Sequence, residues 1–172
     1  MKILKSFFPV LLLLILFGCS TSADAQSPSK EGVTTVRVLD ISADKAWEQL
    51  RILDNIDKLS SSVSKVIFTG DRGVGGERVC IAADGKGRFK ENITAFSDSE
   101  RSYSYAVVEG VPAKNMLNTF KVVDMGYNKS MVVWTSNFEF MQNPQMTEEQ
   151  FRGFLSMASG EMIDNAVKLV KS

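Results

Sequence analysis

The side chains best suited to chemistry lie in two neighbouring strand-like runs of this chain. Glu91 lies in the run 87–96, on a face whose other residues are apolar, because alternate residues of a strand point to the same side. Those apolar residues are Phe89, Ile93 and Ala95. A carboxylate on such a face is costly unless it is paired or protonated. Arg78, on the preceding run 77–82, is the expected partner.

Three interpretations of this pair of charges stay open. It could be a structural ion pair inside a filled core. It could instead orient the polar end of an apolar ligand in a pocket. Glu91 could also be the acid or base of an enzyme, with Tyr103 or Tyr105 donating to an oxyanion. Glu91 is therefore the candidate catalytic residue. Few other groups could share in acid–base catalysis, however, and this favours binding over catalysis.

Histidine is absent from the 172 residues. This removes the usual general base near neutral pH, the Ser-His-Asp triad, Cys-His nucleophiles and most zinc sites. We expect no metal ligands and no cofactor. Six residues are predicted to supply the polar contacts of an otherwise apolar pocket. They are Arg78, Glu91, Tyr103, Tyr105, Trp134 and Asn165.

The alternation of apolar and polar residues predicts seven strands. They cover residues 33–39, 63–69, 77–82, 87–96, 101–109, 115–124 and 130–140. Short turn signals separate the last six strands and indicate antiparallel hairpins. Two helices are expected after the first strand, one from Ala43 to about Leu53 with Ser42 as its N-cap, and a short one over 56–59. Trp47 is expected to pack between the first helix and the sheet.

A long amphipathic helix is predicted over 147–170. Thr147 is its expected N-cap, and acidic residues in the first turn suit the helix dipole. Apolar residues recur at steps of three and four and form one wide stripe. The stripe consists of Phe151, Phe154, Leu155, Ala158, Met162, Ala166, Leu169 and Val170. Asn165 lies on its edge and is the polar residue expected to face the pocket.

Composition and two smaller features narrow the function further. Hydrophobic residues make up 44%, charged residues 23%, and the formal net charge is zero. These values are ordinary for a globular domain and do not favour a nucleic-acid partner. The Gly-rich loop 70–76 lacks the spacing of a phosphate-binding loop and is interpreted as a flexible hairpin that could gate a cavity mouth. Cys80 is expected to be a small buried strand residue rather than a reactive thiol.

The N-terminal region has the pattern of a secretory leader. Residues 1–18 contain two lysines followed by a short apolar run, which is typical of a signal peptide. The run ends in Leu-Phe-Gly-Cys, which resembles the bacterial lipobox and implies cleavage before Cys19 and lipidation of that residue. Residues 19–32 would then be a flexible polar tether, and residues 33–172 the domain. An A-x-A cleavage site ending at Ala25 is the alternative.

These two cleavage sites predict different locations. Lipidation of Cys19 implies a bacterial cell-envelope protein anchored to the membrane by its N-terminal lipid. Ser20, rather than an acidic residue, follows the cysteine and favours the periplasmic face of the outer membrane. Cleavage after Ala25 would instead release a soluble periplasmic protein.

Five segments resemble the polyketide cyclase/dehydrase and lipid-transport family of the START-like (SRPBCC) superfamily. They are Ile41–Trp47, Gly73–Arg78, Arg88–Phe96, Ser102–Gly110 and Val133–Phe138. The resemblance covers about residues 33–170. It implies an α+β helix-grip fold, in which a curved antiparallel seven-stranded sheet wraps around a long C-terminal helix and two short helices follow the first strand.

The resemblance also implies a range of functions. Members of this superfamily bind sterols, lipids, polyketides, plant hormones and other apolar ligands, and only some are enzymes. We therefore expect a small hydrophobic ligand between the sheet and the C-terminal helix. The alternatives are a cyclase/dehydratase-type enzyme using Glu91, and an accessory protein that binds another envelope protein and has a filled core.

Overall fold

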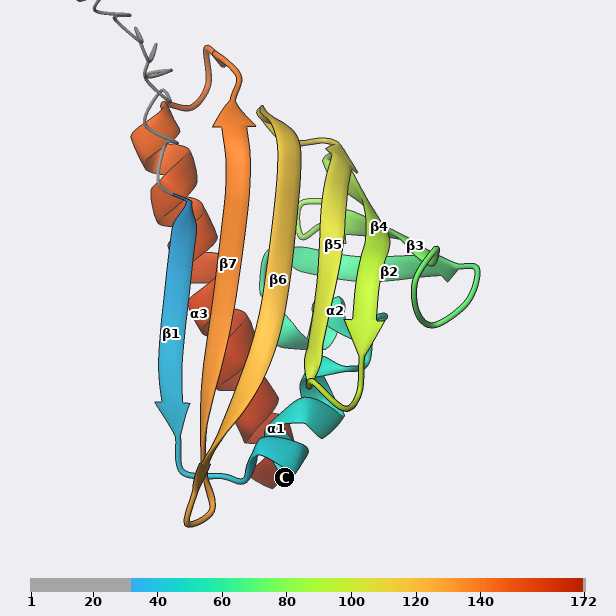
Figure 1. Ribbon diagram of the computed structural model, residues 1–172. Coiled ribbons are helices and arrows are strands. Elements are labelled where there is room, and N and C mark those ends of the chain that lie inside the picture. The colour runs from blue at the N-terminus through green and yellow to red at the C-terminus, as the bar shows by residue number, and fades with distance from the viewer. Residues whose placement is uncertain (1–31, 172) are drawn as a thin grey trace, which may run out of the picture.

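The computed structural model describes residues 32–171, which form a curved sheet and three helices (Figure 1). The strands are β1 (Val33–Leu39), β2 (Val63–Thr69), β3 (Glu77–Ala82), β4 (Arg88–Ser97), β5 (Ser102–Glu109), β6 (Ala113–Gly126) and β7 (Lys129–Phe140). The helices are α1 (Ala43–Leu50), α2 (Ile56–Leu59) and α3 (Glu148–Lys171). The elements follow the predicted order, so the helix-grip fold is confirmed.

The sheet is antiparallel, with the strand order β1-β7-β6-β5-β4-β3-β2. Its last strands, β2 and β3, run across the direction of β5 to β7, so the sheet curls around one side (Figure 1). Helix α3 passes behind β1, β7 and β6, while α1 lies at the lower end of the sheet and α2 lies behind its middle (Figure 1). The curvature leaves the inner face of the sheet turned toward α3.

Side-chain caps fix where the helices begin. Thr147 Oγ1 accepts from the backbone N–H of Gln150 at 3.2 Å, and Gln150 Oε1 accepts from the backbone N–H of Thr147 at 2.8 Å. This reciprocal capping box satisfies two donors at the start of α3 and confirms the predicted cap. Ser42 likewise accepts from the backbone N–H of Lys45 at 3.4 Å.

Helix α1 is shorter than predicted, because it ends at Leu50 rather than Leu53. Asn55 Nδ2 donates to the backbone carbonyl of Gln49 at 3.0 Å. The side-chain amide thus takes the place of the backbone N–H that would pair with this carbonyl if the helix continued. Leu53 is still 2% exposed, because the turn after the helix folds it back into the core.

The end of the core beneath α1 is filled by aromatic rings. Trp47 lies 5.8 Å from Phe96 and 6.3 Å from Tyr103, centroid to centroid. Tyr103 lies 5.4 Å from Phe120, and Phe120 lies 6.4 Å from Trp134. These separations are typical of packed aromatic pairs. Trp47 therefore packs between the first helix and the sheet, as predicted.

The prediction for the inner face of β4 is correct only in its first half. Glu91 and Ile93 are buried, but Ala95 is exposed and Phe96 packs inward. The register of β4 against β5 shifts between Ile93 and Ala95, which marks a β-bulge. An extra residue at a bulge moves every later side chain to the opposite face.

The leader, the lipidation site and nearly all of the tether lie outside the described residues, as does Ser172. Within residues 32–171, no helix is long and apolar enough to cross a membrane.

Candidate functional site

A cavity of about 500 Å³ lies between the inner face of the sheet and the N-terminal half of α3. Most of its wall is apolar, and the apolar lining includes Ile56, Val63, Phe89, Val107, Met116, Phe151, Leu155, Ala158 and Met162. Pockets for small molecules have this composition and volumes of roughly 300–1,000 Å³. Side chains therefore fill one end of the fold and leave a hollow at the other.

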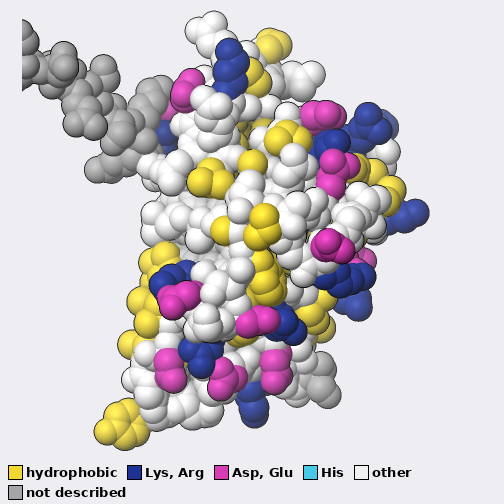
Figure 2. All heavy atoms as spheres, turned by 45° about the vertical axis from the view of Figure 1, so that its right-hand side comes forward, with side chains coloured by type: hydrophobic (Ala, Val, Ile, Leu, Met, Phe, Trp, Pro, Cys, Tyr) yellow, Lys and Arg dark blue, Asp and Glu magenta, His cyan; other side chains and the backbone are white. Residues whose placement is uncertain are grey.

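The exposed members of the lining mark where the cavity meets solvent. Asp84 and Gly87 come from the turn between β3 and β4, and Gly110 comes from the connection between β5 and β6. Phe154, at the start of α3, is 39% exposed and also lines the cavity. Figure 2 shows hydrophobic side chains along the middle of one face of the molecule, with charged side chains beside them.

The loop 70–76 was expected to gate this mouth, and the structure contradicts that expectation. Gly75 N donates to the carbonyl of Ile93 at 2.9 Å, and Ile93 N donates to the carbonyl of Gly76 at 2.8 Å. These bonds hold the loop against β4, and none of its residues lines the cavity. The mouth is instead bordered by the β3–β4 turn, the β5–β6 connection and α3.

Arg78 and Glu91 form the predicted pair on the cavity wall. They stand directly opposite each other on β3 and β4, and are 1% and 4% exposed. Arg78 Nε donates to the Glu91 carboxylate, and Arg78 Nη1 donates to the carbonyl of Leu53 at 2.9 Å. Burial opposes the charge of Arg78, but the Glu91 carboxylate outweighs it and raises the pKa of the guanidinium. The wall therefore carries two charges that neutralise each other.

Tyr105 and Trp134 continue this polar wall. Trp134 Nε1 donates to the Tyr105 hydroxyl at 3.2 Å, and the Arg78 guanidinium lies 4.5 Å from the centre of the Tyr105 ring. Burial, and then the nearby Glu91 carboxylate, raises the pKa of Tyr105 well above its ordinary value. Its hydroxyl is therefore neutral at physiological pH.

Cys80 lies beside the same carboxylate, with its sulfur 3.9 Å from Glu91 Oε2. It is 0% exposed, and burial followed by the charge of Glu91 raises its thiol pKa to about 12. A thiol of this kind is neutral and poorly nucleophilic. The structure thus confirms the prediction that Cys80 is a small buried strand residue rather than a reactive thiol.

Two of the six predicted contact residues lie outside the cavity lining. Tyr103 is 1% exposed, but it stacks on Tyr105 and packs at a tilt against Phe120 in the aromatic end of the core. Asn165 Nδ2 donates to the carbonyl of Leu59 at 2.9 Å, so this side chain ties α3 to the end of α2. The prediction that Asn165 is a polar part of the cavity wall is wrong, because at this position along α3 the apolar stripe packs against α2 rather than facing the cavity.

Several polar residues of the lining were missed by sequence analysis, including Ser60, Ser62, Asp84 and Arg88, and two more on β6 and α3 are almost fully buried. Asn118, on β6, is 2% exposed and lines the cavity. Ser159, on α3, is 0% exposed and shares a hydrogen bond of 2.7 Å with Thr35 on β1. Asn118 could have been found from its place between Met116 and Phe120, because all three share one face of β6.

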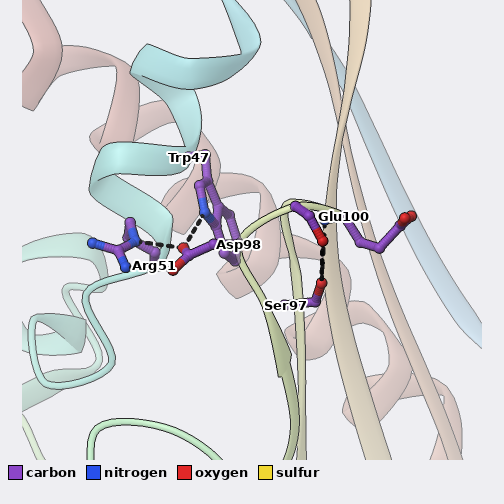
Figure 3. Close-up of polar contacts among 6 residues, drawn as sticks. Trp47, Arg51, Ser97, Asp98 and Glu100 are labelled. Carbon is purple, nitrogen blue, oxygen red and sulfur yellow. Dashed lines mark hydrogen bonds and ion pairs between the residues drawn. The ribbon is translucent and has the colours of Figure 1, made fainter.

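A second polar cluster lies outside the cavity, where α1 meets the β4–β5 turn (Figure 3). Asp98 accepts 2.8 Å hydrogen bonds from Trp47 Nε1 and from Arg51 Nε, and a third of 2.8 Å from Arg51 Nη2. The hydrogen bonds from Arg51, and then from Trp47, lower the pKa of Asp98. This cluster clamps the helix to the sheet.

The chemistry available to the cavity is recognition of a small molecule by apolar walls and a few polar groups. Glu91 Oε2 already accepts from Arg78, so one oxygen of this carboxylate is engaged in the ion pair. Among residues 32–171, no three His, Cys, Asp or Glu side chains gather closely enough to hold a metal ion. Fold and cavity together define a helix-grip domain with an interior pocket.

Comparison with family models identifies the chain directly. Residues 30–170 match the model described as polyketide cyclase / dehydrase and lipid transport. The match covers most of the chain, and the protein belongs to this family. A comparison with curated protein sequences finds no significant relative.

Solved structures of several proteins share the fold. The protein XoxI from Bacillus cereus is 18% identical, with a TM-score of 0.71 over 83% of this chain and 96% of its own. Norcoclaurine synthase from Thalictrum flavum, solved with dopamine and hydroxybenzaldehyde, is 21% identical, with a TM-score of 0.64 over 81% and 88%. The Zhui aromatase/cyclase from a Streptomyces species is 14% identical, with a TM-score of 0.66 over 81% and 93%.

Proposed function

We propose that this protein binds a small hydrophobic or lipid-like molecule in the cavity beneath α3. One observation carries the proposal: about 500 Å³ of mostly apolar space beneath α3, bordered by exposed residues at its mouth. Burial of apolar ligand surface there would stabilise the complex by about 25 cal/mol per Å². The neutralised Arg78–Glu91 pair would orient a polar end of the ligand without demanding an opposite charge.

The cavity also separates this proposal from its alternatives. An accessory protein with a filled core has no use for such a hollow, whereas a binding module requires it. A cyclase or dehydratase would need an acid or base, and the one candidate, Glu91, already has its Oε2 atom in an ion pair with Arg78. Two of the similar structures are of enzymes, a synthase and an aromatase/cyclase, and at 21% and 14% identity they support the fold alone.

The proposal includes a location. We propose that cleavage before Cys19 and lipidation of that residue hold the domain at the membrane of a bacterial envelope, on a tether that ends where β1 begins. Labelling of cells with an alkyne fatty acid would test this. We expect label on the wild-type protein and none on a Cys19→Ala variant. Label on neither protein would favour cleavage after Ala25 and a soluble periplasmic protein.

Ligand binding can be tested with a neutral fluorescent probe, N-phenylnaphthylamine, and two matched substitutions on α3. Ala158 lines the cavity, while its neighbour Met157 is 65% exposed and does not. We expect saturable probe fluorescence with the wild type and Met157→Phe, and weaker probe binding with Ala158→Phe, whose ring takes up part of the cavity. Equal fluorescence with all three proteins, or none with the wild type, would overturn the proposal.

A further inference from the structure

Asn118 is a polar side chain that the fold buries without satisfying. It lies in the middle of β6 and is 2% exposed, yet its Oδ1 atom has no hydrogen-bond partner. Leaving a buried polar atom without a partner destabilises the folded protein. Such atoms in native proteins are normally satisfied by water or by a ligand.

Its position distinguishes Asn118 from similar residues. Within residues 32–171, five buried side-chain oxygens lack a partner, and Asn118 is the residue among these that lines the cavity. The other four are Asn55, Asn92, Ser130 and Ser136. Strand pairing sets Asn118 between Tyr105 on β5 and Ser136 on β7, all on the inner face of the sheet. The free acceptor is therefore built into the wall of the proposed binding site.

The neighbours of Asn118 are already occupied or also lack partners. Trp134 Nε1 donates to Tyr105, and Ser159 shares its hydrogen bond with Thr35. The Arg78 guanidinium is directed to Glu91 and to the carbonyl of Leu53. The wall therefore contains an amide oxygen that no other group satisfies, next to an ion pair whose charges cancel. Neighbouring atoms cover this oxygen while the cavity is empty, so a ligand donor would reach it once the amide turns about its last side-chain bond toward the cavity.

We infer that Asn118 recognises a hydroxyl or N–H donor on a neutral hydrophobic ligand. The inference rests on the proposed function and narrows the ligand class to neutral amphiphiles with one donor group. A hydroxyl suits the amide best, because it donates to the oxygen and accepts from the nitrogen of a carboxamide. An anionic ligand is disfavoured deep in the cavity, because the Glu91 carboxylate faces it and Arg78 is committed to that carboxylate. The other charged residues of the lining, Arg88 and Asp84, are exposed and opposite in sign.

A series of ten-carbon ligands separates these chemistries. Decanol carries a donor, its isomer methyl nonyl ether carries only an acceptor, and decanoate carries a negative charge. Their affinities would be measured by displacement of N-phenylnaphthylamine from the full chain at neutral pH. One neutral hydrogen bond contributes about 1 kcal/mol. We therefore expect decanol to bind about five- to tenfold more tightly than the ether and decanoate to bind most weakly.

The Asn118→Leu variant tests whether this residue is the cause. Leucine has a similar shape and no polar atom, so the preference for decanol over the ether should disappear while the ether still binds. Asn118→Val provides the same test if the leucine variant fails to fold.

Each outcome has a distinct meaning. Equal affinity of the wild type for decanol and the ether would refute the inference and leave the proposed function standing, with the amide satisfied by water. A preference that persists in Asn118→Leu would assign the donor contact to another residue and also refute it. Displacement by none of the three ligands would count against the proposed function itself.

Discussion

The two ends of the interior are built from the same sheet and serve opposite purposes. Beneath α1, the rings of Trp47, Phe96, Tyr103 and Phe120 fill the space, and the clamp of Asp98 holds the helix in place. Beneath the start of α3, residues of similar apolar character surround about 500 Å³ of empty volume. The difference shows that stability and binding are assigned to different ends, with the Arg78–Glu91 pair at the boundary between them.

The largest effect is expected at that boundary. Arg78→Leu leaves the Glu91 carboxylate buried and unpaired, which should lower the free energy of unfolding by about 3–5 kcal/mol. Urea denaturation followed by circular dichroism would measure it. The double variant Arg78→Leu/Glu91→Leu should regain most of the loss, since buried ion pairs can often be replaced by apolar residues.

The outer face of the same two strands provides the control for this prediction. Lys90 pairs with Glu77 at 2.7 Å, and both side chains are partly exposed. Lys90→Ala should therefore change stability little. A loss from Arg78→Leu no larger than that from Lys90→Ala would show that the buried pair has no special role.

Truncating a ring at each end sharpens the contrast in packing. Phe120 is 1% exposed in the filled end, and Phe154 is 39% exposed at the mouth. Phe120→Ala should lower the free energy of unfolding by about 3–5 kcal/mol, as for other fully buried aromatic residues. Phe154→Ala should cost less than about 1 kcal/mol because much of its surface is already in water. Equal losses in denaturation experiments would contradict the division into two ends.

Added side-chain volume should be tolerated at the cavity and should destabilise the filled end. Ala46 is 1% exposed beneath α1, and Ala46→Phe should cost about 1–3 kcal/mol or more through overpacking. Ala158→Phe should cost less than about 1 kcal/mol, because its ring enters existing space. Thermal unfolding of both variants would check this. A collapse in stability with Ala158→Phe would mean that the cavity is too narrow for the added ring.

The smallest expected effect comes from the clamp at Asp98, and it depends on pH. Because the folded protein lowers the pKa of this carboxyl, its contribution is present above the ordinary value of about 3.9. The contribution is lost as the pH falls through the lowered folded value. Asp98→Asn should therefore unfold slightly more easily than the wild type near neutral pH, and the two proteins should converge in acid. A gap that stayed constant with pH would exclude this origin.

The fold could be predicted from the sequence because each element has a strong local signal. The alternation in β5 and β7 placed Tyr105 and Trp134 inside, and the capping box fixed the start of α3 at Thr147. The bulge in β4 could not be predicted, because alternation alone does not reveal where a strand gains an extra residue. It moved Phe96, rather than Ala95, into the core.

The site was predicted only in part, for a different physical reason. Arg78 and Glu91 were found because an isolated charge on an apolar face needs a partner, and strand pairing supplied it. Asn165 was misplaced because the depth at which a helix crosses the sheet is set by tertiary packing. Asn118 is also a polar residue on an apolar strand face, so the rule that identified Glu91 applies to it. Because it carries no charge, the signal is weaker, and the residue was missed.

The most direct test of the central claim, a hollow that accepts apolar molecules, is a crystal structure under xenon pressure. Xenon binds dry apolar cavities and has no other attraction to this wall. The account predicts xenon, or the density of a co-purified ligand, between Met116, Phe151 and Leu155 in the wild type. The density should be weaker in Ala158→Phe, whose ring takes up part of this space. A wild-type crystal with side chains closed over this space and no density in it would contradict the account.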